Sequence, residues 1–396
     1  MQGLRYGRFI VAAVLYLVGF ALIGQSTAAR LATCPAPTSD PYARAVLADG
    51  PTVYYRLDEP SGSTMCDSSA PANNGVFNAG GLTRAVDGAL SNSADAAVAA
   101  DGTPGVIGTS SSPTTISGDH GFTLEGWFSS TGTVQNQALV AIGQGGNGRV
   151  AGLTIWPTGG GCAANGSSIG LDEYGVSNCW DTTAVGVHLF DGHWHYLAVT
   201  YDPTAHQVTG YVDASNLGAQ TPHSRNASFN LTASIVRVGN WGDTFLNQPF
   251  IGTADEVAVY PTALAPARIA AHHAAALVKP PKSTLKAASP RIAVRKGKKA
   301  RAGTITLIAR CNQNAAGVLK GTITERLGRK HVRRVRLSTV HTALKAGVAK
   351  KVKMSVPAAV VLALKRGASE SAAFTLTAKN ANGTTSVKAL IGSLRL

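Results

Sequence analysis

Short apolar or aromatic runs alternate with clusters of Gly, Asn, Asp, Ser and Thr between residues 42 and 261. Helical periodicity is nearly absent there, and this pattern is typical of an antiparallel β-sandwich. The predicted strands lie at 52–58, 122–128, 138–144, 152–158, 193–202, 207–213, 234–240 and 252–260. The stretch TALAPARIAAHHAAAL (262–277) predicts one short closing helix, because Pro266 suits a first helical turn.

The segment DGHWHYLAVTYD (191–202) is compatible at first with a metal site, a sugar platform or a plain strand. On an extended backbone His193 and His195 share one face, while Trp194 and Tyr196 share the other. Both faces stay largely apolar further along, as expected for a central strand that is covered on both sides. A metal site needs further ligands, and no Cys or His at a suitable spacing accompanies the two histidines. The pattern therefore favours a strand.

A second β-rich region is predicted after the proline-containing segment VKPPKSTLKAASP (278–290). We take 277–290 as a linker, because paired prolines stiffen the chain and remove backbone donors. Beyond it, VKMSV (352–356) and FTLTAK (374–379) alternate apolar and polar positions, and NANG (380–383) predicts a turn. Residues 357–367 predict one short helix. The expected fold is all-β, with a small sandwich at 291–396.

The first 28 residues have the layout of a secretory signal peptide. Arg5 and Arg8 precede an apolar run at 9–24, and Ser26 and Ala28 occupy the −3 and −1 positions of the expected cut. We therefore expect a secreted or extracellular protein that begins at Ala29. Two alternatives stay open. The apolar run, although short for a membrane span, could remain as an uncleaved anchor, and LATC (31–34) faintly resembles a lipoprotein box.

Charge divides the chain into two halves. From Lys279 onward there are 26 basic and 2 acidic residues, a net charge of +24, whereas residues 29–278 carry 8 basic and 19 acidic residues, a net of −11. The basic runs 294–301 and 329–336 predict contact with polyanions such as wall polymers, acidic polysaccharides or phospholipid headgroups. Because Phe374 is the only aromatic residue after the linker, we expect no specific nucleic-acid recognition. A merely solvated charged surface is the alternative.

Five cysteines in an exported chain predict disulfides. Cys162 and Cys179 flank a stretch that could form a turn and a strand, so a disulfide between them would hold the two ends of this stretch together. Cys34 and Cys66 then pair by elimination. Cys311 is left as a buried thiol in the basic half.

Residues 42–276 resemble the laminin-G-like jelly-roll family of the concanavalin A-like lectin and glucanase superfamily. The resemblance rests on four ordered pieces: VLADGPTVYYRLDEPSGST, FTLEGWF, DGHWHYLAVTYD followed by GYVD, and IGTADEVAVYPTALAPARIAAHHAA. It implies a two-sheet jelly roll, usually extracellular, that binds glycans or proteins and sometimes holds calcium. Most such domains are not enzymes. Residues 291–396 resemble, in pattern only, immunoglobulin-like sandwiches at the C-termini of exported actinobacterial proteins.

The resemblance also implies candidate calcium ligands, because calcium prefers several oxygen ligands. They are Asp255 in ADEV, Asp67 in MCDSS and, as a third residue, Glu59. Such an ion would be structural and would pin the ends of the domain together. The alternative is that Asp255 pairs within a sheet edge and that Asp67 forms a turn.

Two tryptophans in polar surroundings, Trp180 and Trp241, are candidate sugar-stacking residues. Trp127 and Trp194, which lie on predicted strands, are expected to pack in the core. The alternative for Trp180 and Trp241 is a ring folded over the rim of the sandwich.

Catalytic residues are not evident in the sequence. Catalytic glucanases of this superfamily place two or three acids alternately along one strand, so that a nucleophile and an acid/base carboxyl face the same glycosidic bond at roughly 5 Å. Here Asp172 and Glu173, like Asp255 and Glu256, are adjacent and should point to opposite faces of a strand. No nucleophile elbow, P-loop or zinc-protease motif occurs. The sequence thus predicts a non-enzymatic, secreted or cell-wall-associated module that binds carbohydrate or mediates adhesion. A structural or protein-interaction component of the envelope is the alternative, and a glucanase-type hydrolase is less favoured.

Overall fold

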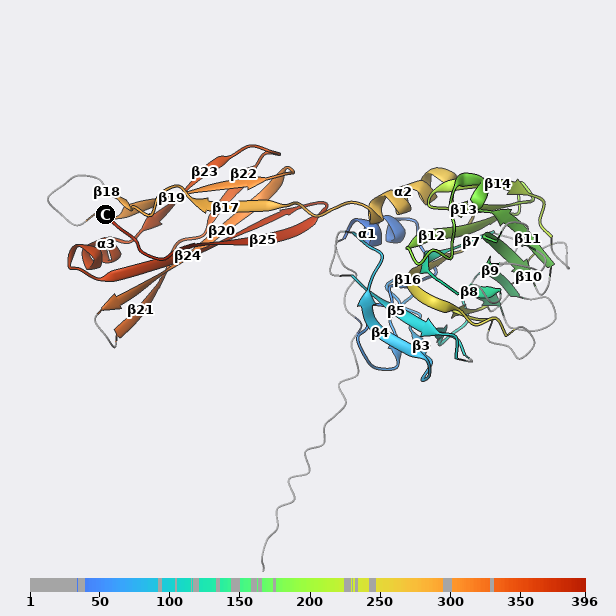
Figure 1. Cartoon of the computed structure of the whole chain (residues 1–396). Coiled ribbons are helices and arrows are strands. Elements are labelled where there is room, and N and C mark those ends of the chain that lie inside the picture. Colours follow the sequence, from blue (N-terminus) through green and yellow to red (C-terminus); the bar gives the residue numbers. More distant parts are fainter. Residues whose placement is uncertain are drawn as a thin grey trace, which may run out of the picture. The chain divides into compact units, whose positions relative to one another are not determined.

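The computed structural model describes residue 34 and residues 40–396, apart from 92–94, 104, 115, 117–120, 133–135, 144–149, 158–161, 163–165, 174–175, 224–228, 230, 232–233, 242–246, 295–300 and 328–330 (Figure 1). The predicted signal peptide lies outside these residues. So does most of the basic run 294–301. None of the described helices has the length and apolar character needed to cross a membrane.

Two antiparallel sheets of eight strands each form the N-terminal part of the described chain. Sheet 1 has the order β14-β13-β12-β7-β16-β5-β4, and β1 pairs with β16. Its strands are β14 (Ser215–Gln220), β13 (Gln207–Val212), β12 (His195–Asp202), β7 (Phe122–Ser129), β16 (Ile251–Tyr260), β5 (Ala96–Asp101), β4 (Leu82–Asp87) and β1 (Val53–Tyr55).

Sheet 2 has the order β11-β10-β9-β8-β15-β6-β3-β2. Its strands are β11 (Val176–Asp181), β10 (Ser168–Glu173), β9 (Val150–Trp156), β8 (Gln137–Gly143), β15 (Ile235–Val238), β6 (Gly108–Ser110), β3 (Gly75–Phe77) and β2 (Thr64–Met65). A 3-10 turn, η1 (Thr183–Val185), follows β11. All eight strands predicted in this part of the sequence are present within a few residues.

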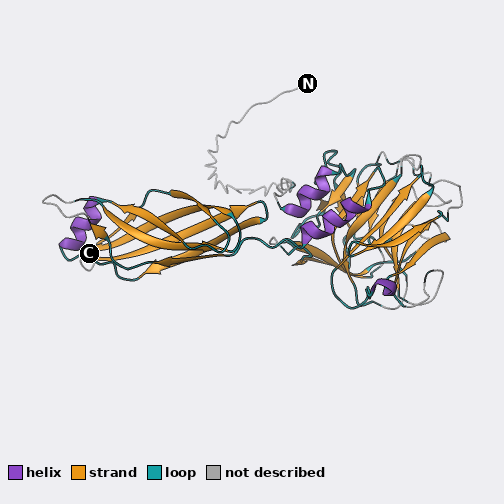
Figure 2. Ribbon diagram, turned by 90° about the horizontal axis from the view of Figure 1, so that it is seen from above, coloured by secondary structure: helices purple, strands orange, loops and turns teal. Residues whose placement is uncertain are grey.

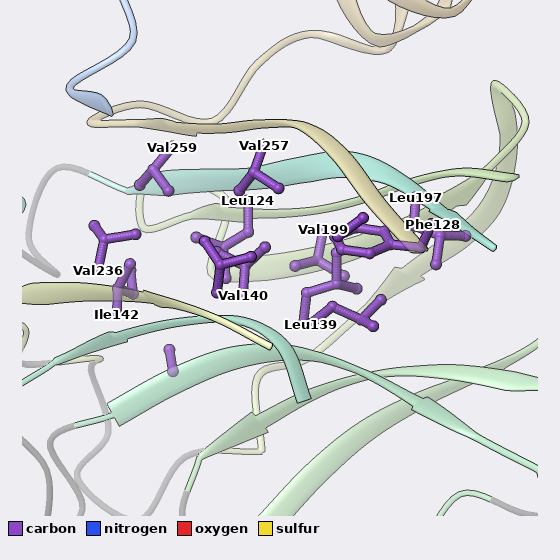
Figure 3. Close-up of a cluster of buried hydrophobic side chains, with 14 of the residues drawn as sticks. Leu124, Phe128, Leu139, Val140, Ile142, Leu197, Val199, Val236, Val257 and Val259 are labelled. Atoms are coloured by element: carbon purple, nitrogen blue, oxygen red, sulfur yellow. The ribbon is translucent and has the colours of Figure 1, made fainter. Parts of the chain in front are cut away.

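One hydrophobic core fills the space between sheets 1 and 2. Figure 3 shows side chains of both sheets meeting there, among them Leu124 and Val199 from sheet 1 and Val140 and Ile142 from sheet 2. Because alternate residues of each strand face this space, the period-two pattern of the sequence is the direct cause of the layered arrangement. The fold is an all-β jelly-roll sandwich, as predicted.

Two helices cover the outer face of sheet 1. They are α1 (Pro41–Ala48), which the sequence analysis missed, and the predicted closing helix α2 (Pro266–Ala276). Tyr42 of α1 and Ile269 of α2 pack with Tyr196 and Tyr260 of the sheet in a second hydrophobic cluster. Strand β12 therefore has apolar neighbours on both faces, which confirms the prediction for residues 193–202.

Both predicted disulfides are present, Cys34–Cys66 and Cys162–Cys179. The second bond connects Cys162, between β9 and β10 in the chain, to β11, which pairs with β10. Cys311 is a buried free thiol, also as predicted.

The C-terminal residues form two further sheets. Sheet 3 contains β17 (Ser283–Ala287), β19 (Gly303–Cys311), β18 (Ala293–Val294) and β23 (Lys350–Val356). Sheet 4 has the order β21-β20-β24-β25, with β22 also paired to β20. Its strands are β21 (His331–Arg336), β20 (Ala315–Leu327), β24 (Ser369–Asn380), β25 (Gly383–Ile391) and β22 (Val340–Leu344).

Sheets 3 and 4 enclose a core of their own, in which Ile305 and Met354 meet Leu319 and Phe374. The predicted helix is α3 (Ala358–Lys365), and its Val360 and Val361 join this core. Strands dominate here, as Figure 2 shows. The segment expected to be a linker, 277–290, contains strand β17, because its alternating Ser283, Leu285 and Ala287 pack inward. The likeness to immunoglobulin-like modules stays a prediction.

Candidate functional site

A cluster of carboxylates surrounds the buried guanidinium of Arg56, directly after β1. Nη2 of Arg56 lies 2.8 Å from Oδ2 of Asp58, and its Nε lies 3.2 Å from Oε1 of Glu256. Carboxyl oxygens of Asp95 and Asp40 lie 3.7 and 3.8 Å from the same Nη2. Tyr54 donates a hydrogen bond from its hydroxyl to Glu256. One positive charge thus faces several buried acids.

Asp255 and Glu256 join this cluster together, contrary to the sequence prediction that they point to opposite faces. The pairing of β16 with β7 shifts register between Asp255 and Ala258, so this part of β16 forms a β-bulge. Glu256 adopts a φ of 53°, in the left-handed region. The bulge interrupts the two-residue alternation and brings both carboxylates to one place.

Ligand atoms of Asp95, Asp255 and Glu256 all lie within 4.8 Å of one another. Burial raises the pKa of Asp95 to about 6, and burial together with the charge of Asp95 raises the pKa of Asp255. Buried carboxyl groups at this separation either share protons or need a cation beside them to stay ionised.

The donor set fits a calcium ion, whose ligands in proteins are carboxylate and carbonyl oxygens. One oxygen of each aspartate is already used, because Leu90 N donates to Oδ2 of Asp95 and Ala89 N donates to Oδ2 of Asp255. Oδ1 of Asp95 and Oδ1 of Asp255 are buried without a hydrogen-bond partner. A Cβ at Gly88 would come within 3 Å of both carboxylates, so the backbone passes close by. We therefore regard Asp95, Asp255 and Glu256 as the candidate calcium ligands.

The other two predicted ligands, Asp67 and Glu59, do not join this group. Asp67 accepts four hydrogen bonds, from Tyr54 N and Ser69 N on Oδ1 and from Asn73 N and the Ser69 hydroxyl on Oδ2. Its oxygens are therefore occupied in holding a turn, which was the alternative interpretation. Glu59 accepts from Cys66 N beside the disulfide. Both residues organise the loops near Cys66.

A surface pocket of about 480 Å³ lies beside the loop that Asp67 holds. Thr52 and the segments 71–74 and 111–114 line it. Asn73 joins the two segments, since its Nδ2 donates to Ser112 O at 2.7 Å and its Oδ1 accepts from Ser112 N at 3.1 Å. The pocket offers amide and hydroxyl groups with proline rings beside them. Its volume falls within the range of small-molecule sites.

The rings of Trp180 and Trp241, the candidate sugar-stacking residues, are both buried. Trp180 lies in β11, is 3% exposed and donates from Nε1 to Gly218 O. Trp241 is fully buried and donates from Nε1 to Oε1 of Gln248. Trp180 packs in the core between the two sheets, whereas Trp241 packs against Ala138, Ala141 and Val150 in a separate cluster. The polar residues beside both rings in the sequence concealed this burial.

The two histidines, His193 and His195, have different environments. The His193 side chain is exposed beside Asp191, whereas His195 is buried with Nδ1 2.8 Å from Asp213 and Nε2 3.2 Å from Asp191. Burial disfavours the charged imidazole, but Asp213 and Asp191 raise the pKa of His195 above its usual value. The pair does not belong to a metal-binding group among the described residues.

A second buried network, which the sequence analysis missed, joins sheet 1 to its two helices. Glu125 of β7 accepts hydrogen bonds from the hydroxyls of Tyr196 and Tyr260. His272 of α2 lies with Nδ1 3.1 Å from Glu125 and Nε2 2.8 Å from Asp49. The signal in the sequence was a glutamate inside the apolar strand FTLEGWF, because a buried charge needs a partner.

Asp172 and Glu173, the other adjacent acids, are both buried in β10. Like Asp255 and Glu256, they are closed to solvent. A glycosidase needs carboxyls that reach a bound substrate, and none of these four can do so as the side chains lie in this structure.

Comparison with known proteins links the jelly roll to a large superfamily. Residues 101–270 match a family model described as the concanavalin A-like lectin/glucanases superfamily. A search of curated proteins finds no match.

Among solved structures, domain 4 of AbnA, an extracellular GH43 arabinanase of Geobacillus stearothermophilus in complex with arabinotriose, is 17% identical, with 56% of this chain and 98% of that one covered and a TM-score of 0.42. The CBM40 of a Ruminococcus gnavus IT-sialidase bound to α2,3-sialyllactose is 16% identical over 40% and 82% of the chains, with a TM-score of 0.30. Trypanosoma rangeli sialidase is 12% identical over 57% and 32%, with a TM-score of 0.39. At these scores the likenesses carry no functional argument.

Proposed function

We propose that this protein is a secreted, non-catalytic binding protein whose jelly roll binds carbohydrate. The observation that carries the proposal is the match of residues 101–270 to the concanavalin A-like lectin/glucanases superfamily. The burial of Asp172, Glu173, Asp255 and Glu256 supports binding rather than hydrolysis. Two disulfides support export to an oxidising compartment.

The candidate glycan site is the pocket between segments 71–74 and 111–114. Its amide and hydroxyl groups are suited to sugar hydroxyls, and the loop is held in place by the four hydrogen bonds to Asp67. A site that is already ordered binds with a smaller entropic cost. A calcium ion on Asp95, Asp255 and Glu256 would be structural, because these residues are buried.

The test is a glycan array probed with the chain from Ala29 onward, followed by titration of the best neutral glycan. Ser112→Trp places a large ring in the pocket and should weaken binding by about tenfold or more. Ala219→Trp, on the exposed side of edge strand β14, is the matched control and should leave the affinity unchanged. Absence of binding to every glycan would refute the proposed function. Full binding by Ser112→Trp would refute the assignment to this pocket.

A further inference from the structure

The outward face of sheet 4 carries a group of exposed basic side chains on adjacent strands. Arg334 and Arg336 of β21 pair with Thr324 and Thr322 of β20, so all four belong to one face of the sheet. Alternation along β20 adds Arg326 and Lys320 to the same face. The basic residues of this face include Arg326, Arg334, Arg336, Lys320, Lys379 on β24 and Lys388 on β25, and all six are exposed.

These cations form a connected path. Residues two apart on a strand lie about 7 Å apart and neighbouring strands about 4.8 Å apart. Arg326, Arg334, Arg336 and Lys320 therefore follow one another at Cα spacings of about 7–8 Å. Lys320, Thr375 and Lys388 lie in one row across β20, β24 and β25, which extends the path across the sheet.

Negative charge is absent from this face. Glu325 and Glu370 are the only two acidic residues after Lys279, and both side chains are buried in the interior. Glu325 accepts a hydrogen bond from Nε of Arg333, which lies on the other side of β21 from Arg334. The acid thus connects the edge strand β21 to β20, while Arg334 and Arg336 stay directed to solvent.

Hydroxyl groups separate the cations. Thr322, Thr324, Ser371 and Thr375 share this face, because Thr324 pairs with Ser371 and Lys320 with Thr375. Exposed apolar side chains stand on the two edge strands, Val332 on β21 at 60% and Leu390 on β25 at 77% exposure. Charged, hydroxyl and apolar groups therefore occur together on one face of the sheet.

The outward face of sheet 3 is also basic but differs in chemistry. Among the described residues, the exposed basic side chains there are those of Lys286, Lys351, Lys353 and one arginine, Arg310. Guanidinium groups bind carboxylates and sulfates through two parallel hydrogen bonds, whereas lysine acts as a point charge. Because sheet 4 has three neighbouring arginines, we favour it over sheet 3 as a face that binds carboxylates or sulfates.

We propose that the outward face of sheet 4 binds an acidic polysaccharide. Carboxylate or sulfate groups would pair with the arginine path, sugar hydroxyls with the threonine and serine side chains, and ring C–H surfaces with Val332 and Leu390. Nucleic acid is disfavoured because the unit's only aromatic residue, Phe374, is buried and cannot stack on bases. This site is separate from the pocket of the jelly roll and does not depend on it.

The experiment measures binding of the chain from Ala29 onward to immobilised polygalacturonate over a series of salt concentrations. Arg334→Gln with Arg336→Gln removes two charges from the proposed path. Lys351→Gln with Lys353→Gln removes two charges from sheet 3 and is the matched control. We expect the arginine variant to lose about tenfold in affinity and the slope of log affinity against log salt to fall by about one to two units. The lysine control should change by less than about twofold.

Several outcomes would overturn the proposal. Equal losses in the two double variants would show that only the net charge matters. No retention of the unaltered protein on polygalacturonate would exclude the site, as would tighter binding to duplex DNA or to phosphatidylglycerol vesicles than to polygalacturonate. Thermal melts of both variants establish that they are folded. Because neutral glycans report on the jelly roll, failure here is distinguishable from failure of the proposed function.

Discussion

Glu325 on β20 and Glu370 on β24 face each other directly across sheet 4, and both side chains are buried. Like charges at opposed positions of a sheet repel each other. Glu325 has Arg333 as a partner, whereas neither carboxyl oxygen of Glu370 accepts a hydrogen bond from a described donor. Burial and the charge of Glu325 raise the pKa of Glu370 to about 7. Sheet 4 is therefore more stable when Glu370 is protonated.

Glu370→Gln should stabilise the protein above neutral pH. Glu370 binds its proton more tightly in the folded than in the unfolded chain, so stability falls as the pH rises from about 4.5 to about 7. The neutral amide removes this loss, and we expect a gain of roughly 1–3 kcal/mol at alkaline pH. Urea unfolding of both proteins across this pH range checks the prediction. Glu325→Gln, which also removes the partner of Arg333, should give a smaller gain. A Glu370→Gln protein with the wild-type pH profile would contradict the account.

His272 should give a pH dependence of the same sign, over a higher pH range. Burial lowers the pKa of this imidazole, but Glu125 and Asp49 outweigh it and raise the pKa above the ordinary value. The folded state therefore gains stability from the imidazolium below pH about 6.5, and this gain is lost as the pH rises through the folded pKa.

His272→Gln should cost on the order of 3 kcal/mol at low pH, since it leaves the buried Glu125 without its cation, whereas Asp49 keeps Arg268. The difference in unfolding free energy between wild type and variant should shrink as the pH rises, and chemical denaturation at several pH values measures it. The test uses this difference rather than the pH dependence of wild-type stability alone, because the pKa of His195 is also raised. His193→Gln, on an exposed side chain, serves as the control and should change stability by less than about 0.5 kcal/mol. If the difference in unfolding free energy between wild type and His272→Gln were the same at all pH values, a stabilising charge on the His272 imidazole would be ruled out.

Trp180→Phe should weaken folding without affecting glycan binding. The ring packs in the core, and Nε1 donates to Gly218 O at 2.8 Å, so phenylalanine leaves a cavity and an unpaired carbonyl. We expect a loss of about 2 kcal/mol. Titration of the folded variant with the glycan selected on the array should return the wild-type affinity. A marked loss of affinity in a folded variant would restore Trp180 as a binding residue.

The strands were predictable because alternate residues of a strand point to opposite faces. Burial of one face gives the period of two in β23 and β24, and burial of both faces gives the apolar run of β12. The same rule fails at Asp255 and Glu256. A bulge depends on how β16 pairs with β7, which lies more than a hundred residues earlier in the chain, and nothing in ADEV reports that pairing.

The candidate site was predictable only in part for a similar reason. Asp255 was identified through resemblance, but Asp95 comes from a segment that has no pattern of its own, and it reaches Asp255 because β5 pairs with β16. Trp241 has polar neighbours in the chain and apolar neighbours in space. Local sequence describes the first kind of neighbour and not the second.

Calcium should stabilise the protein through Asp95, Asp255 and Glu256. An ion that binds only the folded state adds about 2.7 kcal/mol when it is present at about one hundred times its dissociation constant. Asp255→Asn removes a central charge of the group, and we expect its thermal midpoint to be the same in excess CaCl2 and in EGTA. Asp67→Asn is the informative comparison, because it weakens the turn at Ser69 and Asn73 but leaves the three carboxylates in place. It should melt at a lower temperature than the wild type and still gain stability from calcium. If the wild-type midpoint does not respond to calcium, protons or Arg56 alone neutralise the cluster. If Asp67→Asn loses the response and Asp255→Asn keeps it, the ligands are those that the sequence first suggested.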